Sequence, residues 1–564
     1  MRYLFALCAA ANALPPALPP FALEGVITTA RDFAAATPLQ APTGLTRSSY
    51  LPVIAGIVEH FRHLQDADGA IIDQYRNVET QYATPCFAFA CATVVANGGD
   101  QTLLPNCTAA LSRSIEELAT GTCADGHCAF FGKPVVFAYR ILSALVAPGV
   151  AAGWRSGLAQ LNPWKDYGFP SGNWGLVAAV GEFMRASVLG ADANTTWFED
   201  MLKFQLGGQG HDQSYSYTPN GLYEDHSGDA GLNPLPYDTF PSSGYLTVLL
   251  HEGYNGTFAP IISELMQRAV WSHLLMQSPS GEIPTGGRSS QHNWNEAVSA
   301  IAYEAYAATT LAAGDAGAAC MFKRAARKSL ASVSRWQNPG GELQIVKNHV
   351  DAAQRWGYEG SVQRAKTPAE PLPRAPKHPE LTPVPIYTLP IRYSFQSNYN
   401  LLPAAMLSAA FAYATPATEA LGECTTFSDV GGFVFQLPEH HLVIANAGGV
   451  YVEVETGADP HYESTGLHRV HVDTCGAQPA PGCVALRGVL GPTASPPIGP
   501  SAEAPPQVTG GGVAVGAFWV RGGVTTALAN MTFQDVSGVA LGACRDQPAR
   551  PARRRSGQLM PPST

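Results

Sequence analysis

The spacing of apolar residues changes once along this chain, and that change limits the possible fold more than any other feature. From about residue 48 to 414, apolar residues recur every three or four positions, with loops rich in Gly, Pro and Asn between. From about Phe427 they alternate with polar residues, as in strands with one buried face. The sequence therefore predicts a helical region followed by an antiparallel β region.

The helical region reads as a succession of amphipathic segments separated by long polar loops. We expect helices over residues 50–64, 86–96, 103–118, 135–145, 174–189, 195–206, 245–252, 261–276, 297–313, 316–336 and 401–414. Paired helices of this kind predict an (α/α) toroid of helical hairpins, which collects functional loops at one end. No repeat of fixed period is visible, so any symmetry lies in the structure.

The β region predicts an antiparallel β-sandwich of short strands. We expect strands over residues 433–435, 441–444, 450–454, 468–472, 484–490, 513–520 and 524–533. Pro-rich stretches at 367–390 and 492–506 predict extended connectors. The predicted domains are a signal peptide at 1–22, a toroid at 48–415, a sandwich at 424–545 and a disordered basic tail at 546–564.

The beginning of the chain and its cysteines predict secretion. Arg2 precedes a short apolar stretch, and small residues near Ala22 offer a cleavage site. No later run has the roughly 18 uninterrupted apolar residues of a membrane span. Of the 11 cysteines, Cys8 lies in the predicted signal, and the even remainder suits disulfides. Cys123 with Cys128, and Cys475 with Cys483, are candidate local bridges. Sequons stand at Asn106, Asn194, Asn255 and Asn530.

The charge balance limits the partners. A formal net charge of −10 argues against non-specific binding to nucleic acid. The same charge repels an anionic polymer, so an acidic polysaccharide would need a locally basic or amide-lined cleft. We find no nucleotide-binding motif and no zinc-like ligand spacing, and we expect neither a cofactor nor a metal.

Polar clusters with catalytic potential interrupt the helical region between Gly172 and Glu296. They comprise the stretches 172–175 (GNWG), 223–226 (YEDH) and 286–296 (GGRSSQHNWNE), together with Tyr237. These clusters supply an amide, an imidazole, a phenol and a guanidinium from separate segments. Such a set can converge on one sugar-binding cleft, where proton abstraction beside a carboxylate needs these groups.

The helical region followed by a β-sandwich resembles the (α/α)-toroid polysaccharide lyases, a superfamily with hyaluronate/chondroitin AC lyases, alginate lyases and heparinase II/III-like enzymes. The order of residues is similar too. The resemblance implies that Asn173, beside Trp174, is the catalytic Asn, and that His226 and Tyr237 are the catalytic His and Tyr. It implies that Arg288 is the catalytic Arg.

The chemistry of β-elimination explains these residue types. The C5 proton of a uronate is removed while the bond to O4 breaks, and Asn173 or Arg288 can stabilise the enolate-like intermediate. Tyr237 can take the proton as phenolate and return it to O4. A phenol pKa near ~10 is too high for this task, so Arg288 or protonated His226 must lower it. Neutral His226 is the alternative base for the opposite C5 epimer.

Neighbouring residues predict the rest of the cleft. We expect substrate contacts from Trp174, Tyr223, Glu224, Tyr245, His292, Asn293, Asn295 and Glu296. Tyr245 is also the second choice for the base. More ordinary roles stay open: Asn173 can cap a helix, His226 can be an ion-paired surface residue, and the stretch 292–296 can cap the helix that follows. Residues 73–82 are either another wall of the cleft or a polar loop.

Two other classes of protein remain in view. An inverting glycoside hydrolase needs two carboxylates roughly 6.5–9.5 Å apart, which Glu224 or Asp225 could form with Glu296. Unsaturated-glucuronyl hydrolases share the toroid. A non-catalytic carbohydrate-binding protein would keep the aromatic residues without needing Asn173, His226 and Arg288 together.

Overall fold

The computed structural model describes the greater part of the chain. It describes residues 23–39, 41–74, 76–168, 170, 172–190, 196–206, 217–225, 235–236, 239, 242–284, 286, 289, 292–345, 396–447 and 450–457, and the backbone of 466–473, 485–488, 518–521 and 524–527. The predicted signal peptide, the basic tail, both Pro-rich stretches, the Cys475–Cys483 pair and two of the four sequons, Asn194 and Asn530, lie outside the described residues.

Six inner elements of the described chain contact one another in a closed circuit. They are α3 (Ala83–Ala96), α5 (Gly132–Leu142), α8 (Asn173–Leu189), the π-helix η7 (Ser242–Leu246) continued by α11 (Thr247–His251), α13 (Trp294–Ala312) and α15 (Gln396–Tyr413). Each contacts the next, and α15 returns to α3. These elements are buried on nearly all sides; every residue of α3 except its last is buried. Apolar residues all round a helix produce this burial.

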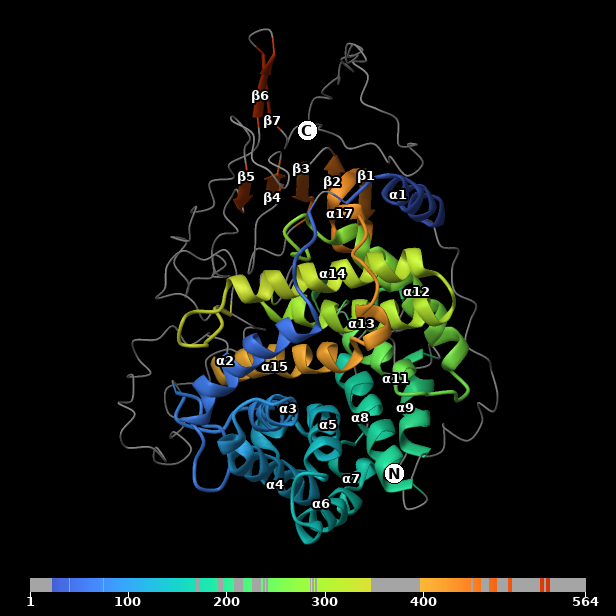
Figure 1. Cartoon of the computed structure of the whole chain (residues 1–564). Helices are drawn as coiled ribbons and strands as arrows, with labels where there is room; N and C mark the ends of the chain where they lie inside the picture. Colours follow the sequence, from blue (N-terminus) through green and yellow to red (C-terminus); the bar gives the residue numbers. More distant parts are fainter. Residues whose placement is uncertain are drawn as a thin grey trace, which may run out of the picture.

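An outer set of helices covers the circuit. Its members are α2 (Tyr50–Arg62), α4 (Leu104–Thr120), α6 (Pro148–Gln160), α9 (Thr196–Leu206), α12 (Ala259–Met276) and α14 (Ala316–Arg335). Each packs one apolar face on an inner partner: α4 on α3, α6 and α9 on α8, α12 on η7, α14 on α13, and α2 on α15. Figure 1 shows α14 and α15 in the upper part of the helical region and α3 to α6 in the lower part. The contacts agree with the predicted helical toroid.

A buried polar network helps to join the ends of the circuit. The Tyr50 hydroxyl on α2 donates to Glu304 on α13 at 2.8 Å. Arg327 on α14 bonds both Glu304 and Glu419, the last residue of the short helix α16 (Pro416–Glu419). The first helix of the outer set, α2, is thereby tied to helices that lie more than 250 residues later in the chain.

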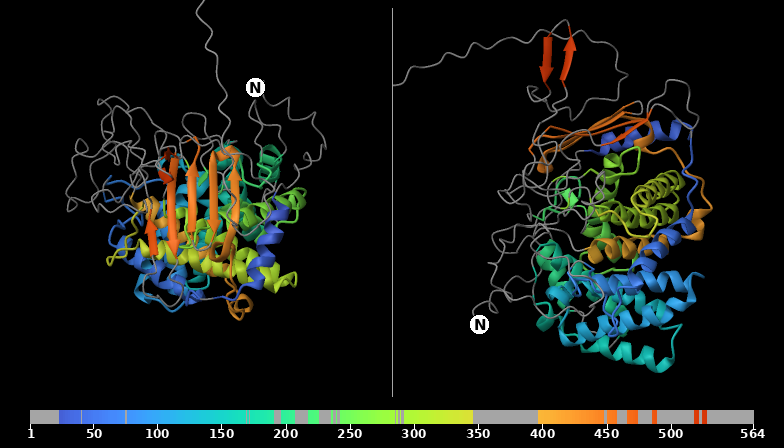
Figure 2. Two further views of the ribbon diagram at one scale, coloured as in Figure 1. Left: turned by 90° about the horizontal axis from the view of Figure 1, so that it is seen from above. Right: turned by 90° about the vertical axis from the view of Figure 1, so that its left-hand side faces the viewer.

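The described strands form one antiparallel sheet of five and a separate pair. The sheet has the order β1 (Gly431–Leu437), β2 (Leu442–Ala447), β3 (Val450–Glu455), β4 (Gly466–Asp473) and β5 (Ala485–Gly488), and β6 (Phe518–Arg521) pairs with β7 (Val524–Ala527). Buried and exposed residues alternate along β1, as the sequence predicted. Figures 1 and 2 show this sheet lying over the α14 side of the helical region. The second layer of a sandwich stays a prediction.

Several short elements were not predicted. The helix α1 (Glu24–Ala36) follows the predicted signal and contacts β1 and α17 (Phe427–Val430). Residues from Phe427 therefore begin as a helical turn, and the strand starts at Gly431. The 13-residue helix α6 (Pro148–Gln160) was not predicted either. The others are α7 (Pro163–Asp166), α16 (Pro416–Glu419), η1 (Arg47–Ser49), η2 (Gln101–Leu103), η3 (Ala124–Gly126), η4 (Cys128–Phe130) and η9 (Pro438–His440). Within the described ranges, none of the helices is long and apolar enough to span a bilayer.

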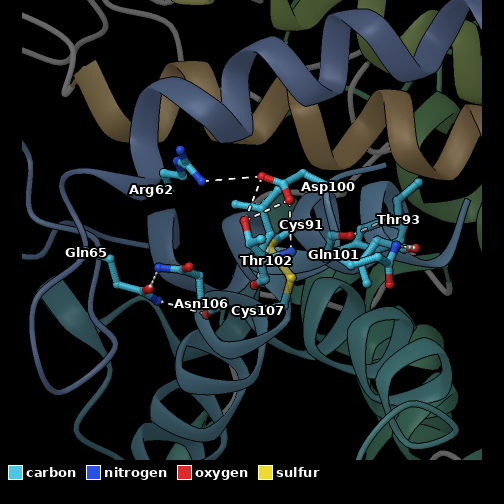
Figure 3. The surroundings of a disulfide bond; sticks show 12 residues. Arg62, Gln65, Cys91, Thr93, Asp100, Gln101, Thr102, Asn106 and Cys107 are labelled. Atoms are coloured by element: carbon cyan, nitrogen blue, oxygen red, sulfur yellow. Dashed lines mark hydrogen bonds and ion pairs between the residues drawn. A yellow bond between two sulfur atoms is a disulfide. The ribbon is translucent and has the colours of Figure 1, made fainter. Parts of the chain in front are cut away.

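Disulfides fasten neighbouring segments. The predicted bridge between Cys123 and Cys128 is confirmed. Cys91–Cys107 joins α3 to α4 beside the turn between them, as Figure 3 shows, and Cys320–Cys424 joins α14 to the segment after α16. Cys86 is buried and unpaired, so the even count does not mean complete pairing.

Candidate functional site

Long segments of the chain precede every inner helix, whereas short ones follow. The leading segments are 63–82, 121–131, 161–172, 207–241, 277–293 and 336–395, and the trailing ones include 97–103, 143–147 and 313–315. Long connections with polar side chains carry functional groups more often than short turns do. The N-terminal ends of the inner helices are therefore the place to look for a site.

Hydrogen bonds and ring contacts join these N-terminal ends in a closed circuit. Gln81 N donates to Asp125, the Trp174 ring lies 4.7 Å from His127, and Asn173 bonds Asp225. Leu235 N donates to Gly286 O, the His292 ring lies 5.2 Å from Tyr399, and Ser397 bonds Asp73. We call the ring formed by these residues the mouth. Because helix N-termini carry partial positive charge, the mouth suits an anionic ligand.

Asn173 and Asp225 form the best-defined polar pair of the mouth. Asn173 is the first residue of α8 and is 5% exposed. Its backbone N–H donates to Asp225 Oδ1 at 2.8 Å, and its side-chain Nδ2 donates to Oδ2 at 3.0 Å. One carboxylate thus accepts an orphan N–H of the helix and also fixes the amide. Because Nδ2 carries two hydrogens, the second can meet a ligand.

Gly172 allows this approach. Its φ is +63°, a left-handed conformation that other residues rarely adopt. A Cβ at this position would also lie 3.1 Å from Asp225 Oδ1. The glycine ahead of Asn173 is therefore required by both the backbone and the carboxylate that packs against it.

Aromatic side chains from two leading segments and from the first turn of α8 gather beside this pair. Trp174 contacts His127 at 4.7 Å and Phe130 at 5.3 Å between ring centroids, and Phe130 stacks on Tyr82 at 5.0 Å. Trp174 is 38% exposed, whereas Tyr82 and Phe130 are buried. We call these four residues the aromatic platform. An exposed indole supported by further rings can stack on a sugar.

The platform is held by its own loop. The Cys123–Cys128 disulfide closes the segment that carries His127, and Asp125 in this loop accepts from the backbone of Gln81 at 3.2 Å. The His127 imidazole contacts Asp125 O at 2.9 Å. The confirmed local bridge therefore belongs to the mouth.

A hydroxyl and amide network forms the wall between α3 and α15. Buried Asp73 accepts from Ser397 N at 2.8 Å and from Ser397 Oγ at 3.0 Å. Thr80 Oγ1 lies 2.8 Å from Ser397 Oγ and donates to Asn398 Oδ1 at 2.7 Å. Asn398 in turn donates to Gln81. Residues 73–82, for which a cleft wall was one of two interpretations, lie at the mouth.

The predicted residues at the start of α13 are buried and hydrogen-bonded. Asn293 N donates to Ile345 O at 2.9 Å, Asn295 Nδ2 donates to Ser289 O at 3.3 Å, and Glu296 Oε1 accepts from Ile283 N at 3.0 Å. His292 is fully buried. These bonds hold the segments that lead into α13 and α15, and the predicted substrate contacts of this stretch remain a prediction.

Two predicted tyrosines lie inside the core. Tyr223 is fully buried and donates to Gln205 on α9 at 3.1 Å. Tyr245 is 2% exposed in the π-helix, and burial raises the pKa of its phenol well above the ordinary value. A tyrosine with this pKa is a poor base, so the contacts of Tyr245 favour a role in the wall. Glu224, beside Tyr223, is half-buried.

Three of the four predicted catalytic residues lie outside the described residues. His226, Tyr237 and Arg288 are these positions, and their roles stay predictions. Of the described residues, no group of three or more His, Cys, Asp and Glu side chains is placed to hold a metal ion. His127 and Phe130 were not predicted as platform residues, although the aromatic residues in 127–131 are visible in the sequence.

Comparisons with known proteins add little. No family model matches the chain, and no curated protein matches it. A solved structure described as a possible member of the GH105 family from Salmonella enterica subsp. enterica serovar Paratyphi A is similar at a TM-score of 0.42 and 12% identity, over 66% of this chain and 95% of that one. A TM-score below 0.5 does not establish a shared fold, so the fold described above rests on the helix contacts.

Proposed function

We propose that this protein is a secreted lyase that cleaves a uronic-acid-containing polysaccharide at the mouth by β-elimination. The observation that carries the proposal is the circuit of polar and aromatic contacts joining the N-terminal ends of all the inner helices. Helix N-termini favour the carboxylate of a uronate, and the platform offers Trp174 to a sugar ring.

Asn173 supports elimination in particular. Its amide is oriented by Asp225, so its remaining N–H is held at a fixed place before substrate arrives. A preorganised donor of this kind stabilises a developing enolate, at roughly 3 kcal/mol per donor. Tyr237 remains the proposed base. His226 and Arg288 are the groups proposed to lower the pKa of its phenol. The raised pKa of Tyr245 makes the second choice less suitable.

A glycoside hydrolase is the second candidate. The observation that favours it is Asp225, a buried carboxylate of the mouth that could act with Glu296. In that reaction the amide of Asn173 would orient an acid or base instead of binding the substrate's carboxylate. The two enzymes would share the substrate class and differ in the products.

The disulfides support secretion, since three bridges are uncommon in a reducing compartment. Of the two sequons that the structure describes, Asn255 suits glycosylation, because it is exposed in the turn between α11 and α12. Asn106 is half-buried on α4 and bonded to Gln65 at 2.7 Å.

A digestion experiment tests the proposal. The protein is incubated with glucuronan, alginate, hyaluronan, chondroitin and heparan, and the ultraviolet absorbance and the number of new reducing ends are measured for each polymer. Elimination creates a C4=C5 double bond conjugated to the carboxylate, so we expect absorbance to rise with one substrate. New reducing ends without absorbance would replace the lyase by the hydrolase. Binding without either product would leave a carbohydrate-binding protein.

A further inference from the structure

A buried lysine lies directly beneath the aromatic platform. Lys133 is the second residue of α5, is 8% exposed and borders a small hollow between α3, α5, η7 and α15. The other lining residues are Tyr82, Cys86, Phe89, Phe130, Pro134, Tyr245, Leu402, Ala405 and Met406. Tyr82 and Phe130 belong to both the platform and this lining, so the hollow borders the platform.

The Lys133 amine has more hydrogen-bond donors than the contacts around it use. Its Nζ donates to Gly244 O at 3.0 Å and lies 3.8 Å from the centroid of the Tyr245 ring. An ammonium group has three N–H donors, so one is left after the carbonyl and the ring face. The lining of the hollow contains no acidic side chain, and among the described residues Lys133 has no carboxylate partner.

Burying a positive charge among apolar side chains costs free energy unless a partner of opposite charge is present. Burial lowers the pKa of Lys133 to about 7, and the Cys86 thiol, which faces it from α3, opposes this only in part. Tyr245 faces it from η7, while α15 contributes only Leu402, Ala405 and Met406. A methionine would fill the same space without the cost of burying a charge. The lysine is therefore explained if its ammonium group binds an anionic ligand.

We propose that Lys133 is the substrate-binding cation of the mouth, which takes one carboxylate oxygen of an acidic sugar whose ring lies on the aromatic platform. The hollow is only wide enough for a group the size of a water molecule, so a carboxylate oxygen can enter and a sugar ring cannot. This inference rests on the proposed function and names a residue that the sequence analysis did not consider.

The proposal also accounts for substrate binding by an acidic protein. A formal net charge of −10 repels a polyanion at long range, so attraction must be local. Lys133 and the N-termini of the inner helices supply positive charge at one place, and water is largely excluded there.

A matched pair of oligosaccharides tests this proposal. Glucuronan tetrasaccharide and cellotetraose differ in their carboxylates, and calorimetry measures the affinity of each for the wild type, Lys133→Met and Lys133→Arg. We expect Lys133→Met to weaken the glucuronan complex by roughly 10- to 100-fold, as for loss of a charge-assisted hydrogen bond, and to leave cellotetraose within about twofold. Equal weakening of both sugars, or of neither, would overturn the role of Lys133.

The pH dependence separates charge from packing. Because Lys133 is protonated below its pKa of about 7, glucuronan affinity should fall by about tenfold between pH 6 and pH 8. Lys133→Arg stays charged and should bind glucuronan with a flat pH profile, which tests the proposal even if Lys133→Met fails to fold. His127→Gln removes the imidazole of the platform and should keep the wild-type slope.

Each failure has a different meaning. A wild-type slope that persists in Lys133→Arg would overturn the proposal while leaving the mouth as a sugar site. Failure of the wild type to bind an acidic tetrasaccharide from any of the five polymers named above would contradict both this inference and the proposed function.

Discussion

At the scale of single residues, the Asn173–Asp225 pair is the part of the site that the structure defines best. The amide is both structural, because it holds a buried carboxylate, and a candidate for catalysis. The structural role predicts a loss of unfolding free energy when Asn173 is replaced, and the catalytic role predicts a loss of kcat. The two losses can differ in size, because different contacts determine stability and turnover.

Replacing Asn173 should therefore affect turnover far more than folding. We expect Asn173→Ala to lower the free energy of unfolding by about 1–2 kcal/mol and to lower kcat by roughly 10²- to 10³-fold. Asn106→Ala is the matched control, because it removes a comparable amide bond, from Asn106 on α4 to Gln65, and neither of these residues takes part in the contacts of the mouth (both are labelled in Figure 3). Denaturant unfolding and initial rates measure both. Similar turnover in the two variants would exclude Asn173 from the chemistry.

Cys86 gives a prediction about reactivity. Burial raises the pKa of its thiol to about 12, so almost no thiolate forms near neutral pH. Iodoacetamide at pH 8 should leave Cys86 unmodified in the folded protein and modify it after unfolding, as read from the peptide that contains it. Rapid modification of the folded protein would mean that the hollow beside Lys133 opens widely to solvent.

The sequence predicted which residues lie near the ends of helices better than it predicted how deeply each is buried and what it contacts. Asn173 and Trp174 lie at the mouth because the Gly172 turn and an amphipathic helix follow each other in the chain. The substrate contacts expected from Tyr223 and Tyr245 stay predictions. Their burial could not be foreseen, because their contacts with Gln205 and Lys133 depend on helices distant in sequence. Lys133 was missed because its burial comes from α3, η7 and α15 together.

At the scale of elements, the bridges differ in what they constrain. Cys320–Cys424 closes a separation of 104 residues, whereas Cys123–Cys128 closes one of 5. In the chain-entropy account, removal costs about 4–5 kcal/mol for the long loop and about 2 kcal/mol for the short one.

Paired Cys→Ser variants test this difference. The Cys320/Cys424 variant should show the larger loss of unfolding free energy in guanidinium chloride. The Cys123/Cys128 variant should show the larger loss of sugar binding, because its loop carries His127. The reverse order for binding would remove the platform from the site.

The junction of α14 with the segment before the sheet should respond to acid. Burial by itself raises the pKa of Asp429, but Lys328 at 2.5 Å and Arg324 at 2.7 Å outweigh burial and hold that pKa well below its ordinary value. A depressed carboxyl pKa contributes stability above the unfolded value of about 4, and this contribution is lost as pH falls below it.

Replacing Asp429 should accordingly matter most at neutral pH. We expect Asp429→Asn to cost about 3–5 kcal/mol at pH 7, since it removes the carboxylate that pairs with buried Lys328 and leaves buried Arg324 with Glu423 alone. The cost should become progressively smaller as pH falls from 5 to 2. Exposed Glu116→Gln is the control and should show almost no difference. A constant difference at every pH would contradict the ion-pair account.

Helices and strands could be predicted where apolar residues kept one regular spacing over the whole segment. Strands β1 to β3 and most helices fall within a few residues of their predicted ranges. The helix α1 was missed because it follows the predicted signal and is fixed by contacts with β1 and α17. The change of spacing was placed near Phe427, but the first strand begins at Gly431, because the capping box formed by Thr426 and Asp429 favours a helical turn before it.

At the scale of the whole molecule, the circuit of inner helices explains why distant segments share one site. The residues of the mouth come from leading segments between positions 73 and 399, and no local motif could have brought them together. The succession of helices predicted the circuit, whereas which side chains face each other around it depends on packing that sequence spacing does not reveal.

The central claim is that an acidic saccharide binds at the N-terminal ends of the inner helices. Hydrogen–deuterium exchange of the whole chain, with and without a saturating oligosaccharide of the polymer it cleaves, tests this most directly. The account predicts slower exchange in the stretches 80–86, 127–135, 172–178 and 396–402, and no change in the trailing segments 97–103, 143–147 and 313–315. Protection confined to those trailing segments or to strands β1 to β3, or none at all, would contradict it.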